Sequence, residues 1–292
     1  MQFIGEIRAV NTSDGVFNLV CINKDSEQMN LKLEQGHKFE VNELYIFEYE
    51  AREGERVSYW ITSYKKVLDL PFIEREEHLR DYYKASPLEC SAAKHEIECY
   101  INKLENPIIK DITIHLIEKY KEEFFIYPAA SKMHHAYIGG LAYHSIGMLH
   151  LADGLIENYP YLNKDYVYAG IMLHDIGKTI ELTGAVHTEY SLRGQLLGHL
   201  VLGAMEIEAM ARELGYENTD EVLMLCHMLV SHHGIPQYGA CKKPMTAEAL
   251  VLWYIDTIDS KFRVLGEVLE NTPHGSFTDP IGVLDRQKMY KL

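Results

Sequence analysis

A histidine and an aspartate stand side by side at the end of an apolar stretch in the middle of the chain. The segment GIMLHDIGKTIEL, residues 170–182, carries His174 and Asp175 after its apolar run, followed by Gly177 and Lys178. Imidazole and carboxylate groups both bind divalent cations. The segment therefore predicts a metal site where a helix ends, with a lysine ammonium close to it.

Other apolar runs of helical periodicity are interrupted in the same way. The interrupting residues are His144 in GLAYHSIG, His199 in LLGHLVLG, His232 and His233 in LVSHHG, and Asp256 in LWYIDTID. A polar group that is buried without a partner costs roughly 2–7 kcal/mol. We therefore expect these side chains to converge on a shared divalent cation.

The number of candidate ligands indicates more than one ion. With His174 and Asp175 they number seven, which is more than a structural zinc ion uses. We expect at least two ions, with Asp175 as the bridge between them because His174 beside it can bind one. Histidine and carboxylate ligands without cysteine suit Mn²⁺, Fe²⁺ or Zn²⁺.

The adjacent pair of histidines leaves two alternatives open. Neighbouring helical residues point about 100° apart, so His232 and His233 can both be ligands only if the helix ends there, as Gly234 and Pro236 indicate. Otherwise only one of them binds. His227, one turn earlier, either contacts the ligand residues without binding the metal itself or packs in the core.

The elements that must position these residues follow a β module. Up to about residue 68 the apolar residues alternate with a period near two, in five runs separated by turn signals: 2–10, 16–22, 29–33, 43–51 and 57–67. Five short strands predict a small OB-like barrel, a fold often used on single-stranded nucleic acid. Residues 69–87 mix charge, proline and serine, and are predicted to be a linker.

The remainder of the chain, residues 88–292, is predicted to be helical. Apolar residues recur at three- and four-residue steps in about seven runs that glycine, proline or asparagine separates. The predicted fold is therefore mainly α, with a small β-barrel module at residues 1–68 in front of a helical bundle that carries all the candidate ligands.

Composition limits the classes of partner and compartment. The 292 residues include 43 acidic and 28 basic side chains, a formal charge of −15, which argues against a broad positive surface for nucleic acid. No apolar run reaches the length of about 18 residues that a membrane span needs, and the first residues lack a secretory pattern. Five scattered cysteines without a CxxC motif fit a reducing compartment. These features predict a cytoplasmic protein.

The order of the candidate ligands on successive helices resembles the HD-domain metal-dependent phosphohydrolase superfamily. The stretches YPAASKMHHAYIGGLAYHS, YPYLNKDYVYAGIMLHDIGK, LLGHLVLG, LVSHHG followed by KKP, and YIDTIDSK resemble more closely the YhaM family of 3′→5′ exoribonucleases, in which an OB-type module precedes an HD domain. The resemblance covers about residues 86 to 270. Over residues 1–68 only the rhythm of the strands is similar.

This resemblance implies a reaction and a cofactor. The reaction is hydrolysis of single-stranded RNA, or of single-stranded DNA, from the 3′ end to nucleoside 5′-monophosphates. The cofactor is a pair of divalent ions, Mn²⁺ first, with Fe²⁺, Zn²⁺, Ni²⁺ and Co²⁺ as alternatives. The seven candidate ligands occupy the ligand positions of the superfamily, and Lys178 occupies that of the phosphate-facing lysine.

An acidic chain that digests an acidic polymer needs local positive charge. Lys242 and Lys243 in CKKP, and Lys65 and Lys66 in YKK, are candidates for small basic patches. His135, next to His134 ahead of the first ligand helix, is a further candidate for a substrate contact or a helix cap.

Aromatic residues of the β module are a second class of candidate. Tyr45, Phe47 and Tyr49 share one face of a strand, and Tyr59, Trp60 and Tyr64 follow. Bases that stack on such rings gain about 1–3 kcal/mol each. The core of the barrel is the favoured place for the first three.

Two other functions compete with this one. An HD-type phosphohydrolase could act on nucleotides or cyclic dinucleotides, although IPQYGACKKP after LVSHHG lacks the Gly-Tyr-Pro of the cyclic-dinucleotide branch. A nucleic-acid-binding adaptor could hold a structural metal without turnover, but the number of ligands argues against it. The native metal, the preference for RNA or DNA and the oligomeric state stay open.

Overall fold

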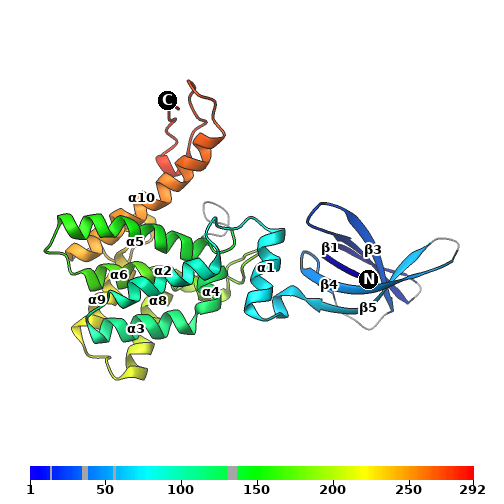
Figure 1. The fold of residues 1–292 in the computed structure, drawn as a ribbon. Helices are drawn as coiled ribbons and strands as arrows, with labels where there is room; N and C mark the ends of the chain where they lie inside the picture. Colours follow the sequence, from blue (N-terminus) through cyan, green and yellow to red (C-terminus); the bar gives the residue numbers. More distant parts are fainter. Residues whose placement is uncertain (14, 35–38, 55–56, 130–136) are drawn as a thin grey trace. The chain divides into compact units, whose positions relative to one another are not determined.

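The chain folds into two compact units. The computed structural model describes residues 1–13, 15–34, 39–54, 57–129 and 137–292, and its internal contacts separate Met1–Lys84 from Ala85–Leu292. The β strands belong to the first unit, and the candidate metal ligands all belong to the second (Figure 1).

The first unit is built on a five-stranded barrel. Its strands are β1 (Gln2–Ser13), β2 (Val16–Ile22), β3 (Gln28–Glu34), β4 (Leu44–Arg52) and β5 (Ser58–Lys66). They close in the order β1-β2-β3-β5-β4, with antiparallel pairing except between β3 and β5. The predicted OB-like barrel is confirmed.

Alternation along each strand decides what the barrel encloses. The side chains that point inward form its core: Ile7, Leu19, Cys21, Leu31, Tyr45, Phe47 and Ile61. Tyr45 and Phe47 retain only 4% and 0% of their exposure, and Tyr49 packs against this core. The rings of β4 are therefore core residues, as favoured, because residues two apart on a strand share a face.

The interval predicted as a linker is ordered, and this part of the prediction needs correction. It contains η1 (Val67–Asp69) and α1 (Phe72–Tyr82), and the boundary between the units falls after Lys84. Leu79 is the one buried residue of α1, and the Tyr82 hydroxyl donates a hydrogen bond to the Ile4 carbonyl at 2.6 Å. A helix with a single buried residue has almost no apolar periodicity to detect.

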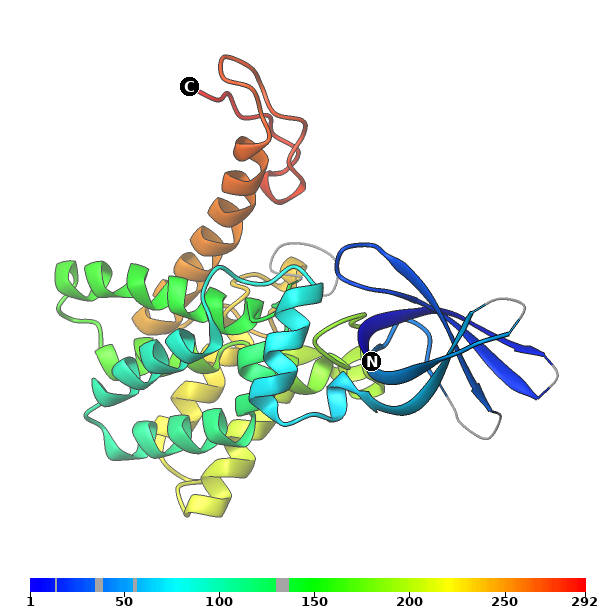
Figure 2. The same cartoon turned by 45° about the vertical axis from the view of Figure 1, so that its right-hand side comes forward.

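The second unit is helical, as predicted. It comprises α2 (Cys90–Asn102), α3 (Pro107–Lys119), α4 (Lys121–Ile126), α5 (Gly140–Asn158), α6 (Lys164–Leu173), α7 (Lys178–Glu181), α8 (Leu192–Leu214), α9 (Asp220–Ser231) and α10 (Ala247–Glu270), with the short turns η2 (Pro236–Tyr238) and η3 (Gly282–Leu284). The helical stretch of residues 107–126 is divided into α3 and α4, because the backbone leaves the helical region at Tyr120. Beyond α10, residues 271–292 fold back on themselves (Figure 2).

Helix α6 lies at the centre of this unit. It packs against α2, α3, α5, α9 and α10, and every residue from Val167 to Leu173 is buried. A helix that is apolar on all sides is buried on all sides. Because α6 ends in the interior, His174 and Asp175 are only 0% and 3% exposed.

Among the described residues, no helix has both the length and the apolar character that crossing a membrane requires.

Candidate metal centre

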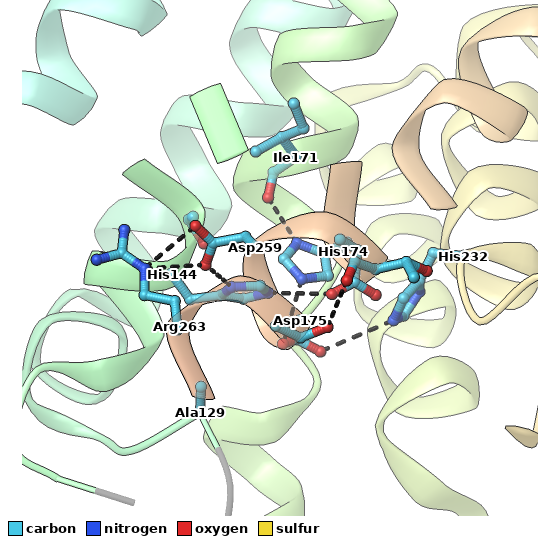
Figure 3. Close-up of polar contacts among 12 residues, drawn as sticks. Ala129, His144, Ile171, His174, Asp175, His232, Asp259 and Arg263 are labelled. Carbon is cyan, nitrogen blue, oxygen red and sulfur yellow. Dashed lines mark hydrogen bonds and ion pairs between the residues drawn. The ribbon is translucent and has the colours of Figure 1, made fainter. Parts of the chain in front are cut away.

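The seven candidate ligands come together inside the helical unit. Their ligand atoms form three overlapping groups, each with all atoms within 4.8 Å of one another: His144, His174 and Asp256; His174, Asp175 and His232; and His199, His232 and His233. They come from α5, α8 and α10 and from the ends of α6 and α9. Figure 3 shows His144, His174 and His232 gathered around Asp175.

Asp175 lies between two sets of imidazoles. Its Oδ2 is 3.2 Å from Nε2 of His174. Its Oδ1 is 3.4 Å from Nε2 of His199 and 3.8 Å from Nε2 of His232. On the side of His174, Nε2 of His144 lies 3.2 Å from Oδ1 of Asp256. The two oxygens of this carboxylate therefore face different imidazoles of the cluster.

Two of the candidate ligands are positioned in the same way by the C-terminal ends of helices. His174 and His232 are the C-cap residues of α6 and α9. Each donates a hydrogen bond from Nδ1 to the carbonyl oxygen three residues earlier, Ile171 or Leu229, at 2.7 Å. Both helices also direct the negative end of their dipole at the cluster, which favours a cation there.

The end of α9 allows both adjacent histidines to reach the cluster. Because α9 ends at Ser231 and Gly234 has a φ of +75°, His232 and His233 are not confined to successive positions of one helix. Their ring centroids are 4.5 Å apart, and that of His233 is 5.1 Å from His199. The structure thus brings both histidines of the pair into one group.

The atoms that face the middle of the cluster fit a divalent metal. Nε2 of His174, His199 and His232 and Oδ1 of Asp175 are buried and have no hydrogen-bond partner among the described residues. Since Nδ1 carries the proton in His174 and His232, lone pairs face one another across the cluster. Each such group costs about 1–3 kcal/mol if it stays unsatisfied. A cation bound to these atoms removes that cost, and a donor set of imidazole and carboxylate suits Mn²⁺, Fe²⁺ or Zn²⁺.

The charge states of His232 and Asp175 suit metal binding. Burial, together with the neighbouring His174 and His233, lowers the pKa of His232 well below its usual 6.5, so its ring is neutral and can donate a lone pair. Burial works to raise the pKa of Asp175, but the Lys178 ammonium and His174 outweigh it and hold the pKa well below 3.8. Asp175 is therefore an anion at neutral pH.

Lys178 lies at the cluster, as the sequence predicts. Its Nζ donates hydrogen bonds to Oδ2 of Asp175 at 2.6 Å and to the carbonyl of Ala129 at 2.7 Å. Burial works to lower the pKa of Lys178, but Asp175 raises it above 10.5. Ala129 is the last described residue before 130–136, so the predicted contact residue His135 lies outside the described residues.

A close approach of two backbone segments places His199. A Cβ atom on Gly177 would lie 2.1 Å from the carbonyl oxygen of His199 and 2.7 Å from the amide of Gly203. At Gly177 the chain therefore passes close to the backbone of α8. Just before His199, α8 is broken at Gly198, where φ is 72°, a conformation that favours glycine.

Two buried carboxylates at the cluster are absent from the predicted site. Oε2 of Glu181 is 3.1 Å from Nδ1 of His199, and Oδ2 of Asp259 accepts a hydrogen bond from Nδ1 of His144 at 2.8 Å. Asp259 also pairs with Arg263 at 3.2 Å (Figure 3). A signal existed for both, because Glu181 lies within GIMLHDIGKTIEL and Asp259 follows Asp256 in LWYIDTID.

The predicted basic pair Lys242–Lys243 is exposed, in the segment that joins η2 to α10. Nε2 of His227 accepts a hydrogen bond from the amide of Met245 at 3.0 Å, which ties this segment to α9. His227 therefore holds this loop against α9 through a hydrogen bond, and it belongs to none of the ligand groups found among the described residues.

In the barrel, most of the candidate surface residues have other roles. Lys66 pairs with Glu40 and Glu43 at 2.5 and 3.2 Å, which neutralises one half of the predicted Lys65–Lys66 patch. Tyr59 and Tyr64 pack against the barrel core. The Trp60 ring is half-buried, and the guanidinium of Arg52 lies 4.5 Å from its centroid.

Comparison with known proteins places this site in a family context. The HD domain family model matches residues 141–261, the interval that contains all seven candidate ligands. The chain is 44% identical over 211 residues to the 3′-5′ exoribonuclease YhaM of Geobacillus sp. (strain WCH70). This alignment covers 72% of this chain and 65% of that protein. It is 41% identical over 222 residues to the protein of the same name from Bacillus pumilus (strain SAFR-032), with 76% and 70% covered. The chain spans about two thirds of the length of these relatives.

Proposed function

The chain belongs to the YhaM family of 3′-5′ exoribonucleases, and we propose that it removes nucleoside 5′-monophosphates stepwise from the 3′ end of single-stranded RNA with the help of divalent metal ions. The observation that carries the proposal is the convergence of seven imidazole and carboxylate side chains in the matched HD domain. An HD domain implies divalent metal binding. Single-stranded DNA is a second substrate of the same chemistry.

We assign the donors to two ions. His144, His174 and Asp256 would hold one ion, and His199, His232 and His233 the other. Asp175 would bridge them, which the different directions of its two oxygens support. Mn²⁺ is the first candidate; Fe²⁺, Zn²⁺, Ni²⁺ and Co²⁺ have compatible ligand preferences.

The residues of the chain support phosphodiester hydrolysis in distinct ways. When bound, divalent ions bring the pKa of water toward neutrality and offset the charge that builds on phosphoryl oxygens. The Lys178 ammonium, held 2.6 Å from Asp175, is placed to donate a hydrogen bond to a phosphoryl oxygen at the cluster. His144, His174 and His232 are buried, so water screens charges at the cluster less, which strengthens both effects.

Binding of a polymer needs contacts beyond the reacting phosphate. Lys242–Lys243 and His135 are our candidates for contacts to the phosphate backbone. In the barrel, Trp60 is the candidate for stacking a base, because it lies outside the core cluster and Arg52 and Lys32 are close to its ring.

All five cysteines are free thiols, which fits a protein that acts in the reducing cytoplasm.

Digestion of 5′-end-labelled single-stranded RNA by the purified chain with Mn²⁺ tests the proposal. We expect a ladder of products that shorten from the 3′ end and release of nucleoside 5′-monophosphates. Asp175→Ala should abolish the ladder. Asp153→Ala, which removes a half-exposed carboxylate bound to Tyr100 and Tyr168 on another part of the unit, should keep it.

Two outcomes would overturn the proposal. Hydrolysis of nucleotides or cyclic dinucleotides with intact RNA would indicate another HD phosphohydrolase. Tight metal and RNA binding without turnover would indicate an adaptor with a structural metal.

A further inference from the structure

We propose that Glu181 and Asp259 are positioning residues that set metal affinity, one for each of the two ions. The inference rests on the metal site of the proposed function and goes beyond it, because neither residue belongs to the seven ligands. Both carboxylates are buried, with 8% and 6% exposure, and each contacts the Nδ1 atom of one ligand histidine.

Four of the candidate imidazoles have an oxygen atom close to Nδ1, and these oxygens are of two kinds. His174 and His232 donate to main-chain carbonyls, which are neutral and are fixed by the helices. His144 and His199 instead face carboxylates. An anionic acceptor makes a stronger hydrogen bond to the ring and increases its basicity as a metal ligand. The two carboxylate contacts are also divided between the two ligand groups.

Asp259 serves the group of His144, His174 and Asp256. Its Oδ2 accepts a hydrogen bond from Nδ1 of His144 at 2.8 Å, which directs the opposite ring nitrogen, Nε2, toward Asp256 at 3.2 Å. Nε of Arg263 donates to Asp259 at 3.2 and 3.4 Å. The guanidinium in turn lies 4.0 Å from the ring centroid of Tyr143. Asp259 is thus held on the side of His144 away from the cluster (Figure 3).

Glu181 contacts the group of His199, His232 and His233 through His199. Both of its carboxylate oxygens lie close to this residue. Oε2 is 3.1 Å from Nδ1 of His199, and Oε1 accepts the backbone N–H of His199 at 3.1 Å. This N–H follows the break in α8 at Gly198, where the regular helical hydrogen-bond pattern is interrupted. Glu181 therefore fixes the backbone and the ring of His199 together.

The consequence is a separable effect on the two ions. Replacing a partner of a ligand histidine typically costs about 10–100-fold in metal affinity. An amide retains one acceptor oxygen but turns an N–H group toward a second donor, so Glu181→Gln and Asp259→Asn each leave one contact unsatisfied. Glu181→Gln should weaken the ion at His199, and Asp259→Asn the ion at His144.

Titration calorimetry of the metal-stripped full chain with MnCl₂ tests this. We expect two binding events in the wild type, and in each variant one event unchanged and the other about 10–100-fold weaker. RNA hydrolysis by each variant should need more Mn²⁺ for half-maximal rate and should approach the wild-type rate at saturating Mn²⁺. A role in folding alone would not produce this rescue.

Controls separate positioning from stability. Glu206→Gln alters a buried carboxylate of α8 that binds Lys119 and Tyr120, and it should leave both Mn²⁺ affinities unchanged. Arg263→Met releases Asp259 without touching a ligand, and it should weaken the same event as Asp259→Asn. Circular dichroism of each metal-free variant verifies the fold.

The inference fails if both positioning variants bind Mn²⁺ as the wild type does, if Glu206→Gln weakens binding equally, or if the wild type takes up no Mn²⁺. Calorimetry needs no RNA, so its outcome is independent of turnover. The separable loss of affinity in a chain that leaves RNA intact would support the positioning role and overturn only the proposed function.

Discussion

Gly177→Ala is a sensitive probe of how the turn after α6 places the site. Gly177 has helical dihedral angles, φ −61° and ψ −19°, where alanine is normally more favourable than glycine by about 0.5–1 kcal/mol. The added Cβ would lie only 2.1 Å from the carbonyl oxygen of His199. Ordinary contact begins near 3.4 Å, so the turn and α8 must separate by about 1 Å, a displacement that can cost roughly 100-fold in rate.

Gly177→Ala should also lower the thermal stability of the protein. Overpacking of this kind costs about 1–3 kcal/mol, which lowers Tm by roughly 2–4 °C for each kcal/mol. Scanning calorimetry of the metal-free chain measures the stability, and 3′-end digestion of RNA at saturating Mn²⁺ measures the rate.

A second glycine supplies the matched control. Gly154 in α5 is exposed and has no atom within 4 Å of an added Cβ, so Gly154→Ala should stabilise the protein by about 0.5–1 kcal/mol and leave the rate unchanged. If Gly177→Ala proved as stable and as active as Gly154→Ala, the argument that this backbone approach positions His199 would be refuted.

Three further perturbations address other parts of the molecule. Lys178→Gln should lower kcat by roughly 10²–10³-fold in the RNA digestion assay, and an unchanged kcat would remove Lys178 from the chemistry. Trp60→Ala should raise the Kd for single-stranded RNA by about 5–150-fold, equivalent to about 1–3 kcal/mol, in a fluorescence anisotropy titration with metal-stripped protein; equal affinity would exclude stacking on this ring. Burial lowers the pKa of His227 below 6.5, so the stability from its bond to Met245 is present above about pH 6.5 and is lost as the pH falls through the folded-state pKa. The Tm difference between wild type and His227→Ala should therefore be smaller at pH 5 than at pH 7.5, and a constant difference would contradict this assignment.

Much of the ligand set could be predicted because it depends on local pattern. A histidine or aspartate in an apolar helical run is conspicuous in any chain, and the cost of burying it alone holds whatever the fold. For this reason the sequence alone indicates His144, His174, Asp175, His199 and Asp256 as candidates. The barrel was equally accessible, since alternation with a period of two reports directly on strands.

Other features depend on which segments meet, and only the tertiary structure decided them. LWYIDTID contains two aspartates one turn apart, and the packing of α10 against α5 makes Asp259 the partner of Nδ1 of His144 while Asp256 faces Nε2. Glu181, in α7, contacts the backbone N–H of His199 directly after the break of α8 at Gly198. The two helices are separate segments of the sequence, so neither one predicts this contact by itself.

The same division explains the one corrected boundary. α1 carries too few buried residues to show periodicity, and it is ordered by contacts such as that between Tyr82 and Ile4. Composition and periodicity thus determined the β module, the helical unit and the residue types of the candidate ligands, because burial of a polar group is costly wherever it occurs. The tertiary structure decided which ring atoms of His144 and His199 face the middle of the cluster, because long-range packing brings the carboxylates of Asp259 and Glu181 to their Nδ1 atoms.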